Sequence, residues 1–153
     1  MGLLIFIAIT ASLYIGYIVV KYGVQRSISA SYNNLETPIK KSLYSWFILC
    51  VALPMMILSD NTIGVLAGMF LMLDFAAPTG GDKMNNFIHC LGADMGMLLG
   101  VLMIGFMFGL WWLVGFTAIL VIALTGIKNS TWWIECVILT SVWIGLLIEK
   151  VLK

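Results

Sequence analysis

The chain has 153 residues, of which 62% are hydrophobic and only 10% are charged, whereas an ordinary soluble domain carries about 25% charged residues. This composition excludes a soluble globular domain and predicts an integral membrane protein. The net charge of +1, with no Lys/Arg cluster beside stacking aromatic residues, excludes a nucleic-acid-binding protein.

Apolar segments, taken in chain order, predict an all-α polytopic bundle of about six transmembrane spans. They cover residues 3–20, 39–58, 62–77, 87–108, 111–126 and 132–148. Because each span needs about 20 apolar residues, six spans occupy most of the chain and predict one integral membrane domain. The first segment has no charge before Lys21, which favours a retained span over a cleaved signal peptide.

A long polar stretch separates the first two predicted spans. It contains four of the eight basic residues: Lys21, Arg26, Lys40 and Lys41. Basic loops are retained on the cytoplasmic side of a membrane, so we expect this loop inside the cell and the N-terminus outside. Thr37 and Pro38 predict the start of the second helix, because Thr caps exposed backbone N–H groups and Pro fits the first turn.

Residues 87–126 form an almost continuous apolar run, about twice the length that one span needs. The chain must therefore reverse direction within the run. Trp111 and Trp112 follow Gly109 near its middle, and Trp favours the level of the lipid headgroups. We therefore expect the reversal at this point.

Three glycines recur at four-residue spacing in the fourth predicted span: Gly92, Gly96 and Gly100. Residues four apart share one face of a helix, so this face has almost no side-chain bulk and allows another helix to approach closely. Packing within the bundle is one interpretation of the stripe. A homo-oligomer interface is the other.

Four ionisable residues fall inside predicted spans: Asp74, His89, Asp94 and Glu135. A charged side chain at the centre of a span costs about 2.5–3.5 kcal/mol by insertion measurements. In the predicted topology all four lie in the cytoplasmic third of the bundle, where groups at equal depth can meet and offset this cost through hydrogen bonds. Within one helix, however, His89 and Asp94 point about 140° apart.

Three interpretations fit this polar layer. The first is a structural network around a small polar cavity near the cytoplasmic face, in a non-enzymatic accessory or lipid-interacting protein whose partners are membrane lipids. The second is a small transporter or proton relay, because buried carboxylates beside a His are typical of such paths. The third is a metal-dependent intramembrane hydrolase, which needs about three protein ligands and an open water position.

Short motifs near the same membrane face carry a resemblance. They are SISASYN at residues 27–33, AAP at 76–78 and HCLGA at 89–93. With them the chain resembles, over most of its length, a group of small polytopic membrane proteins from gut Bacteroidetes and their phages, although Asn33 stands where that group has a second Tyr.

This resemblance implies the same polytopic fold in a bacterial inner membrane. It also implies that Ser29, Tyr32, Asp74, Pro78 and His89 belong to one feature of the cytoplasmic face. The serine segment has a second interpretation as a capped loop, in which Ser hydroxyls satisfy free backbone groups.

The polar layer is also similar to that of membrane ceramidases and related receptor-like hydrolases, which use Ser, Asp and several His at one membrane face. His89 is the single histidine of this chain. The zinc chemistry of that family is therefore not carried over, and we expect no metal, no cofactor and no catalytic residue.

Overall fold

The computed structural model describes residues 2–77 and 82–152, and in these ranges the chain is mainly helical and has no strand. The elements, in chain order, are α1 (Gly2–Tyr22), the short 3-10 helix η1 (Ser29–Asn34), α2 (Pro38–Leu58), α3 (Thr62–Ala76), α4 (Lys83–Leu102), the π-helical turn η2 (Met103–Met107), α5 (Trp111–Leu124) and α6 (Ser130–Leu152). The predicted all-α class is confirmed. Each α-helix, with α4 taken together with η2, coincides with one predicted apolar segment to within four residues at either end.

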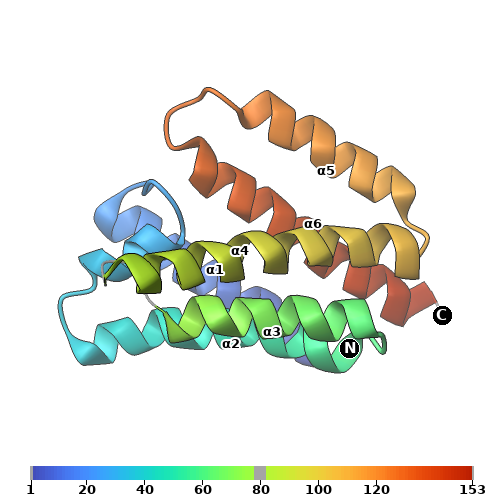
Figure 1. Cartoon of the computed structure of the whole chain (residues 1–153), viewed down its shortest axis with the longest axis horizontal. Helices are drawn as coiled ribbons and strands as arrows, with labels where there is room; N and C mark the ends of the chain where they lie inside the picture. The colour runs from blue at the N-terminus through green and yellow to red at the C-terminus, as the bar shows by residue number, and fades with distance from the viewer. Residues whose placement is uncertain (1, 78–81, 153) are drawn as a thin grey trace.

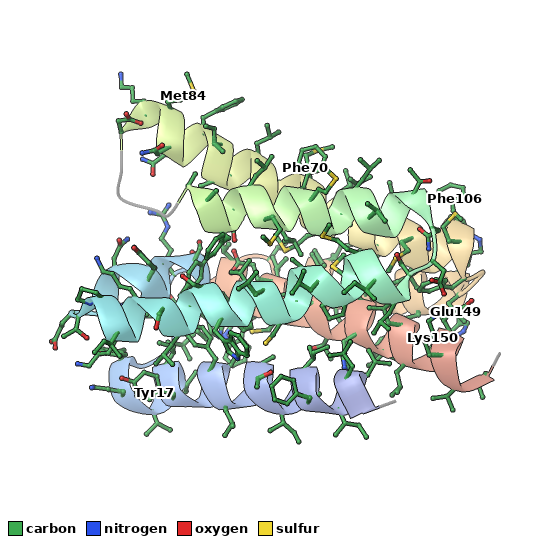
Figure 2. All side chains as sticks on the ribbon, turned by 90° about the horizontal axis from the view of Figure 1, so that it is seen from below. Tyr17, Phe70, Met84, Phe106, Glu149 and Lys150 are labelled. Carbon is green, nitrogen blue, oxygen red and sulfur yellow. The ribbon has the colours of Figure 1, made fainter. Side chains whose placement is uncertain are left out.

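Within the described ranges, four helices are long and apolar enough to cross a membrane: α1, α2, α4 continued by η2, and α6. The other two α-helices are shorter, with 15 residues in α3 and 14 in α5. Large apolar side chains project from the outer faces of the helices, as Met84 of α4 does in Figure 2. Both observations are consistent with an integral membrane protein.

Polar side chains begin three of the helices. Thr37 accepts a hydrogen bond from the backbone N–H of Lys40 at 3.3 Å, and Pro38 occupies the first turn of α2, which confirms the predicted start of this helix. Asn61 caps α3 and Asp82 caps α4 in the same way. Each cap satisfies a backbone N–H group that the first helical turn leaves without a partner.

Successive α-helices run in opposite directions, so both termini lie at one end of the bundle (Figure 1). α3 packs along both α2 and α4, while α5 packs on α6 and η2. At the end that holds the termini, Lys150 of α6 forms an ion pair with Asp60 in the turn before α3. The opposite end holds the α1–α2 connection, which includes η1.

The predicted reversal near Trp111 is confirmed. η2 ends α4, Gly109 has a positive φ of 71°, and α5 begins at Trp111. Positive φ is the left-handed region that glycine adopts without steric cost. The Trp111 ring packs edge-on against Phe106 with ring centroids 4.7 Å apart, so the turn is held by aromatic contact as well as by glycine.

The glycine stripe of α4 lies against helices of the same chain. A Cβ added at Gly92 would lie 2.5 Å from the backbone N of Asp74 and 2.7 Å from the carbonyl O of Phe70. Gly96 likewise faces α3, and Gly100 faces side chains of α2 and α6. The missing side chains therefore allow α4 to lie directly on the α3 backbone.

Buried apolar side chains form two clusters. One occupies the body of the bundle and includes Met55, Leu71 and Ile104. The other lies at the end that holds η1 and includes Leu35 and Trp132. Because Leu35 is fully buried, the polar stretch between α1 and α2 is docked into the bundle rather than extended into solvent.

Candidate functional site

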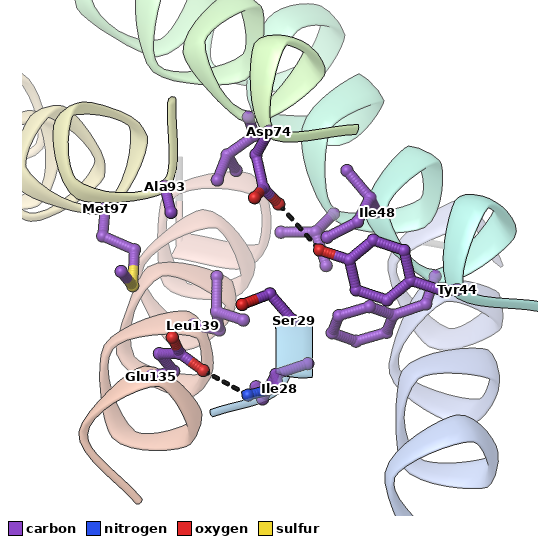
Figure 3. Close-up of a pocket in the computed structure, with 12 residues that line it drawn as sticks. Ile28, Ser29, Tyr44, Ile48, Asp74, Ala93, Met97, Glu135 and Leu139 are labelled. Atoms are coloured by element: carbon purple, nitrogen blue, oxygen red, sulfur yellow. Dashed lines mark hydrogen bonds between the residues drawn. The ribbon is translucent and has the colours of Figure 1, made fainter. Parts of the chain in front are cut away.

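Three helices bring polar side chains together around Asp74, close to the end of α3. Tyr44 of α2 donates a hydrogen bond from its hydroxyl to Asp74 Oδ2 at 3.0 Å, as Figure 3 shows. Nδ1 of His89, on α4, lies 2.6 Å from Asp74 Oδ1. Asp74 and His89 are only 3% and 4% exposed, so the two ionisable groups are buried as a pair.

The close approach of α3 and α4 explains how His89 reaches Asp74. Gly92, one turn beyond His89, lies directly against the Asp74 backbone. A larger residue at this position would move the two helices apart. The glycine stripe and the buried pair are therefore parts of one local arrangement.

Glu135 of α6 lies on the other side of the same region. Its Oε2 accepts a hydrogen bond from the backbone N–H of Ile28 at 2.5 Å, which attaches the segment before η1 to α6. Tyr14 of α1 holds the same segment through a hydrogen bond of 2.6 Å between its hydroxyl and that of Ser31. The α1–α2 connection is therefore fixed from two helices.

Within this connection, serine hydroxyls bond to neighbouring backbone groups. The hydroxyl of Ser27 accepts from the N–H of Ala30 at 3.0 Å, and that of Ser31 donates to the carbonyl of Ile28 at 2.5 Å. These bonds match the capped-loop interpretation of the serine segment.

A small cavity of about 30 Å³ lies between the two carboxylates. Its walls include Asp74 and Tyr44 on one side, Glu135 on the other, and Ser29 from the connection (Figure 3). A cavity needs roughly 10–15 Å³ of probe-occupied volume to hold one water molecule. The space therefore fits one or two water-sized groups.

A much larger cavity of about 560 Å³ forms a groove between α1, α2 and α6. Its lining is mostly apolar, with small residues such as Ala8, Ala11 and Gly16 on the α1 side. At the end near the N-terminus, Trp143 donates a hydrogen bond to the carbonyl of Leu4 at 3.1 Å, which joins α6 to α1. The groove and the small cavity adjoin, because both are lined by Ile28, Phe47, Val51 and Leu139.

The remaining predicted site residues lie outside this buried group or at its edge. Asp94 is on the exposed side of α4 and makes no hydrogen bond to Asp74, His89 or Glu135. Tyr32 packs its ring against Tyr44 with centroids 5.6 Å apart. Pro78, the last predicted member of the cytoplasmic-face motif, lies outside the described residues.

Metal-ligating side chains do not cluster in the part of the chain that the structure describes. Among residues 2–77 and 82–152, no three His, Cys, Asp or Glu side chains group closely enough to hold one metal ion. The cysteines are spread over the bundle, with Cys50 buried and Cys90 exposed. The hydrolase interpretation therefore has no supporting ligand set in the described part of the chain.

Sequence reasoning missed Tyr44 and Tyr14, and it missed the groove. A tyrosine in the interior of an apolar span needs a partner for its hydroxyl, so these two residues carried a signal. The sequence carries no such signal for the groove, because its walls come from helices far apart in the sequence.

The site thus combines a buried polar group at one end of the bundle with an apolar groove along it. Comparison of the chain with protein-family models, curated proteins and solved structures finds no match.

Proposed function

We propose that this chain is a non-enzymatic, lipid-interacting protein that crosses a bacterial inner membrane six times and binds a lipid chain in the groove between α1, α2 and α6. The groove is the observation that carries the proposal. Its volume of about 560 Å³ lies within the range of roughly 300–1,000 Å³ that is usual for ligand pockets.

The length of the groove also suits a lipid chain. Its α1 wall extends from Ile7 to Gly16, about 14 Å at the rise of an α-helix. Its α6 wall extends from Trp133 to Leu146, about 20 Å. Half of the hydrocarbon core of a bilayer is about 15 Å thick, so an extended acyl chain from one leaflet matches the groove.

The six-span arrangement requires the two short helices, α3 and α5, to cross the membrane as well. α3 and α5 are about 21–23 Å long, less than the hydrocarbon core of about 30 Å. Local thinning of the bilayer can accommodate short spans at modest cost. The basic residues between α1 and α2 support an orientation with that connection in the cytoplasm and both termini outside.

A transporter or proton relay is supported only by the buried pair of Asp74 and His89. The groove that leads from the small cavity towards the opposite end is lined mostly by apolar side chains. A path for ions along it would have almost no polar lining. The lipid-binding function requires no such path.

The proposal is tested by filling the groove. Gly16 lines it, and a Cβ at this position meets no atom within 4 Å, so Gly16→Trp places an indole in the groove without a backbone clash. Gly115→Trp on the exposed face of α5, where a Cβ is equally free, is the matched control. Both variants and the wild type are purified in mild detergent, and co-purified lipid is measured by mass spectrometry.

We expect stoichiometric lipid with the wild type and with Gly115→Trp, and a loss of most of it with Gly16→Trp. Equal lipid in all three proteins at matched monodispersity, or none in any of them, would contradict the proposal.

A further inference from the structure

The small cavity gives the proposed lipid site a distinct polar end. Asp74 reaches it from α3 and Glu135 from α6, and the apolar groove adjoins it through shared wall residues such as Phe47 and Leu139 (Figure 3). A chain held in the groove thus has its end next to two carboxylates.

These carboxylates have more acceptor sites than the protein has donors for them. Asp74 is 3% exposed, and each of its carboxylate oxygens has one neighbour: the Tyr44 hydroxyl at Oδ2 and, 2.6 Å away, Nδ1 of His89 at Oδ1. Glu135 accepts a bond from Ile28 at Oε2, whereas a carboxylate has about four acceptor sites. Both carboxylates can therefore accept further hydrogen bonds at the cavity, so a ligand that donates hydrogen bonds is favoured there.

The charge of the cavity excludes an anionic group. None of the described residues that line it is a Lys or Arg. The cavity has two carboxyl groups, and the one basic side chain beside them, that of His89, is already paired with Asp74. A cation in the cavity would offset part of the cost of burying these charges.

The size of the cavity selects among cations. About 30 Å³ accommodates a group of one or two water-sized units, which suits a primary ammonium and is too small for a phosphate diester or a sugar. We infer that the groove takes an amphiphile with one apolar chain and a primary ammonium head, and that the head lies between Asp74 and Glu135. This inference rests on the proposed lipid-binding function.

Three probes with the same chain test the inference: hexadecylamine, hexadecanol and hexadecanoate, each titrated into the protein in neutral detergent and followed by native mass spectrometry. A charge-assisted hydrogen bond predicts that the amine binds about tenfold or more tightly than the alcohol. The carboxylate should bind more weakly than either.

Glu135→Gln should reduce amine binding to the level of the alcohol and leave alcohol binding unchanged. Gln retains an acceptor for the Ile28 N–H, so the connection can remain docked. Asp74→Asn provides a second variant with the same expected direction. Asp94→Asn removes one negative charge from the exposed side of α4 and serves as the matched control, with no change expected.

Equal wild-type binding of the three probes would overturn the inferred head chemistry while leaving chain binding in place. An amine preference that survives in both Glu135→Gln and Asp74→Asn would overturn the inferred position of the head. Failure of all three probes to bind would instead overturn the proposed function itself.

Discussion

A single buried carboxylate, that of Asp74, joins three helices. It accepts the hydroxyl of Tyr44 from α2 and lies beside the ring of His89 from α4. In an apolar environment a polar group that loses its partner keeps its desolvation cost, so such contacts matter more when broken than when formed. The stability of the protein should therefore be sensitive to small changes at single residues of the polar layer.

Tyr44→Phe should lower the free energy of unfolding by about 1 kcal/mol, because it removes the donor to Asp74 Oδ2 and keeps the ring. Equilibrium unfolding in mixed micelles with increasing dodecyl sulfate measures the change. Tyr32→Phe is the control, since Tyr32 packs on Tyr44 but its hydroxyl makes no hydrogen bond to the described residues. Equal destabilisation by the two variants would show that the bond to Asp74 contributes nothing specific.

Glu135→Ala should release the segment before η1, because Ile28 then has no acceptor for its N–H. We expect hydrogen exchange at the Ile28 amide to become faster by about tenfold, the equivalent of a bond worth about 1.4 kcal/mol. Exchange detected by mass spectrometry of peptides from residues 23–37 reports this. Glu36→Ala, which removes only an exposed ion pair with Lys40, should leave the exchange of Ile28 unchanged.

The polar residues could be located from the sequence, and their partners could not. Asp74, His89 and Glu135 stand out because ionisable groups are rare in apolar spans, and their similar depth indicated one layer. Asp94 shares that depth but faces outward. The angle of about 140° between His89 and Asp94 indicated different directions, yet only the rotation of α4 about its axis decides which one is buried.

At the scale of helices, the main structural feature is the close contact between α3 and α4. Gly92→Ala should lower the free energy of unfolding by about 1–3 kcal/mol, because the new Cβ would lie 2.5 Å from the Asp74 backbone N and 2.7 Å from the Phe70 carbonyl O. Backbone atoms cannot rotate away as a side chain can. Unfolding in mixed micelles measures the effect.

Gly115→Ala is the matched control for this variant. It is also a Gly→Ala change inside an apolar helix, but a Cβ at Gly115 meets no atom within 4 Å. We expect unchanged or slightly higher stability, since Ala is the better helix former by about 0.5–1 kcal/mol. Equal destabilisation at both positions would mean that helix contact is not what requires Gly92.

The helices themselves were predictable, since long apolar runs bounded by polar caps fix where each one begins and ends. Their lateral arrangement was not. The groove exists because α1 and α6, the first and last helices, are separated from each other beside α2. No local sequence pattern encodes that separation. Small residues such as Ala11 and Gly16 can be recognised as its α1 wall only once the neighbouring helices are known.

For the whole molecule, the alternating helices divide the connections into two sets at opposite ends. One end holds the α1–α2 connection with Asn34, and the other holds the α2–α3 turn with Asn61. The proposed orientation places the first end in the cytoplasm, because Arg26 and its basic neighbours lie there. Two cysteines introduced at these ends should therefore differ in their accessibility from outside the cell.

The measurement starts from a variant in which Cys50, Cys90 and Cys136 are replaced by alanine. Asn61→Cys in this background should react with a membrane-impermeant maleimide added to intact spheroplasts, and Asn34→Cys should react only after lysis. Both asparagines lie in polar connections rather than within α-helices, so solvent access is comparable once the membrane is opened. The reverse pattern would invert the orientation, and it would place the polar cavity and the proposed ammonium head in the outer leaflet, where the amphiphile would then have to enter.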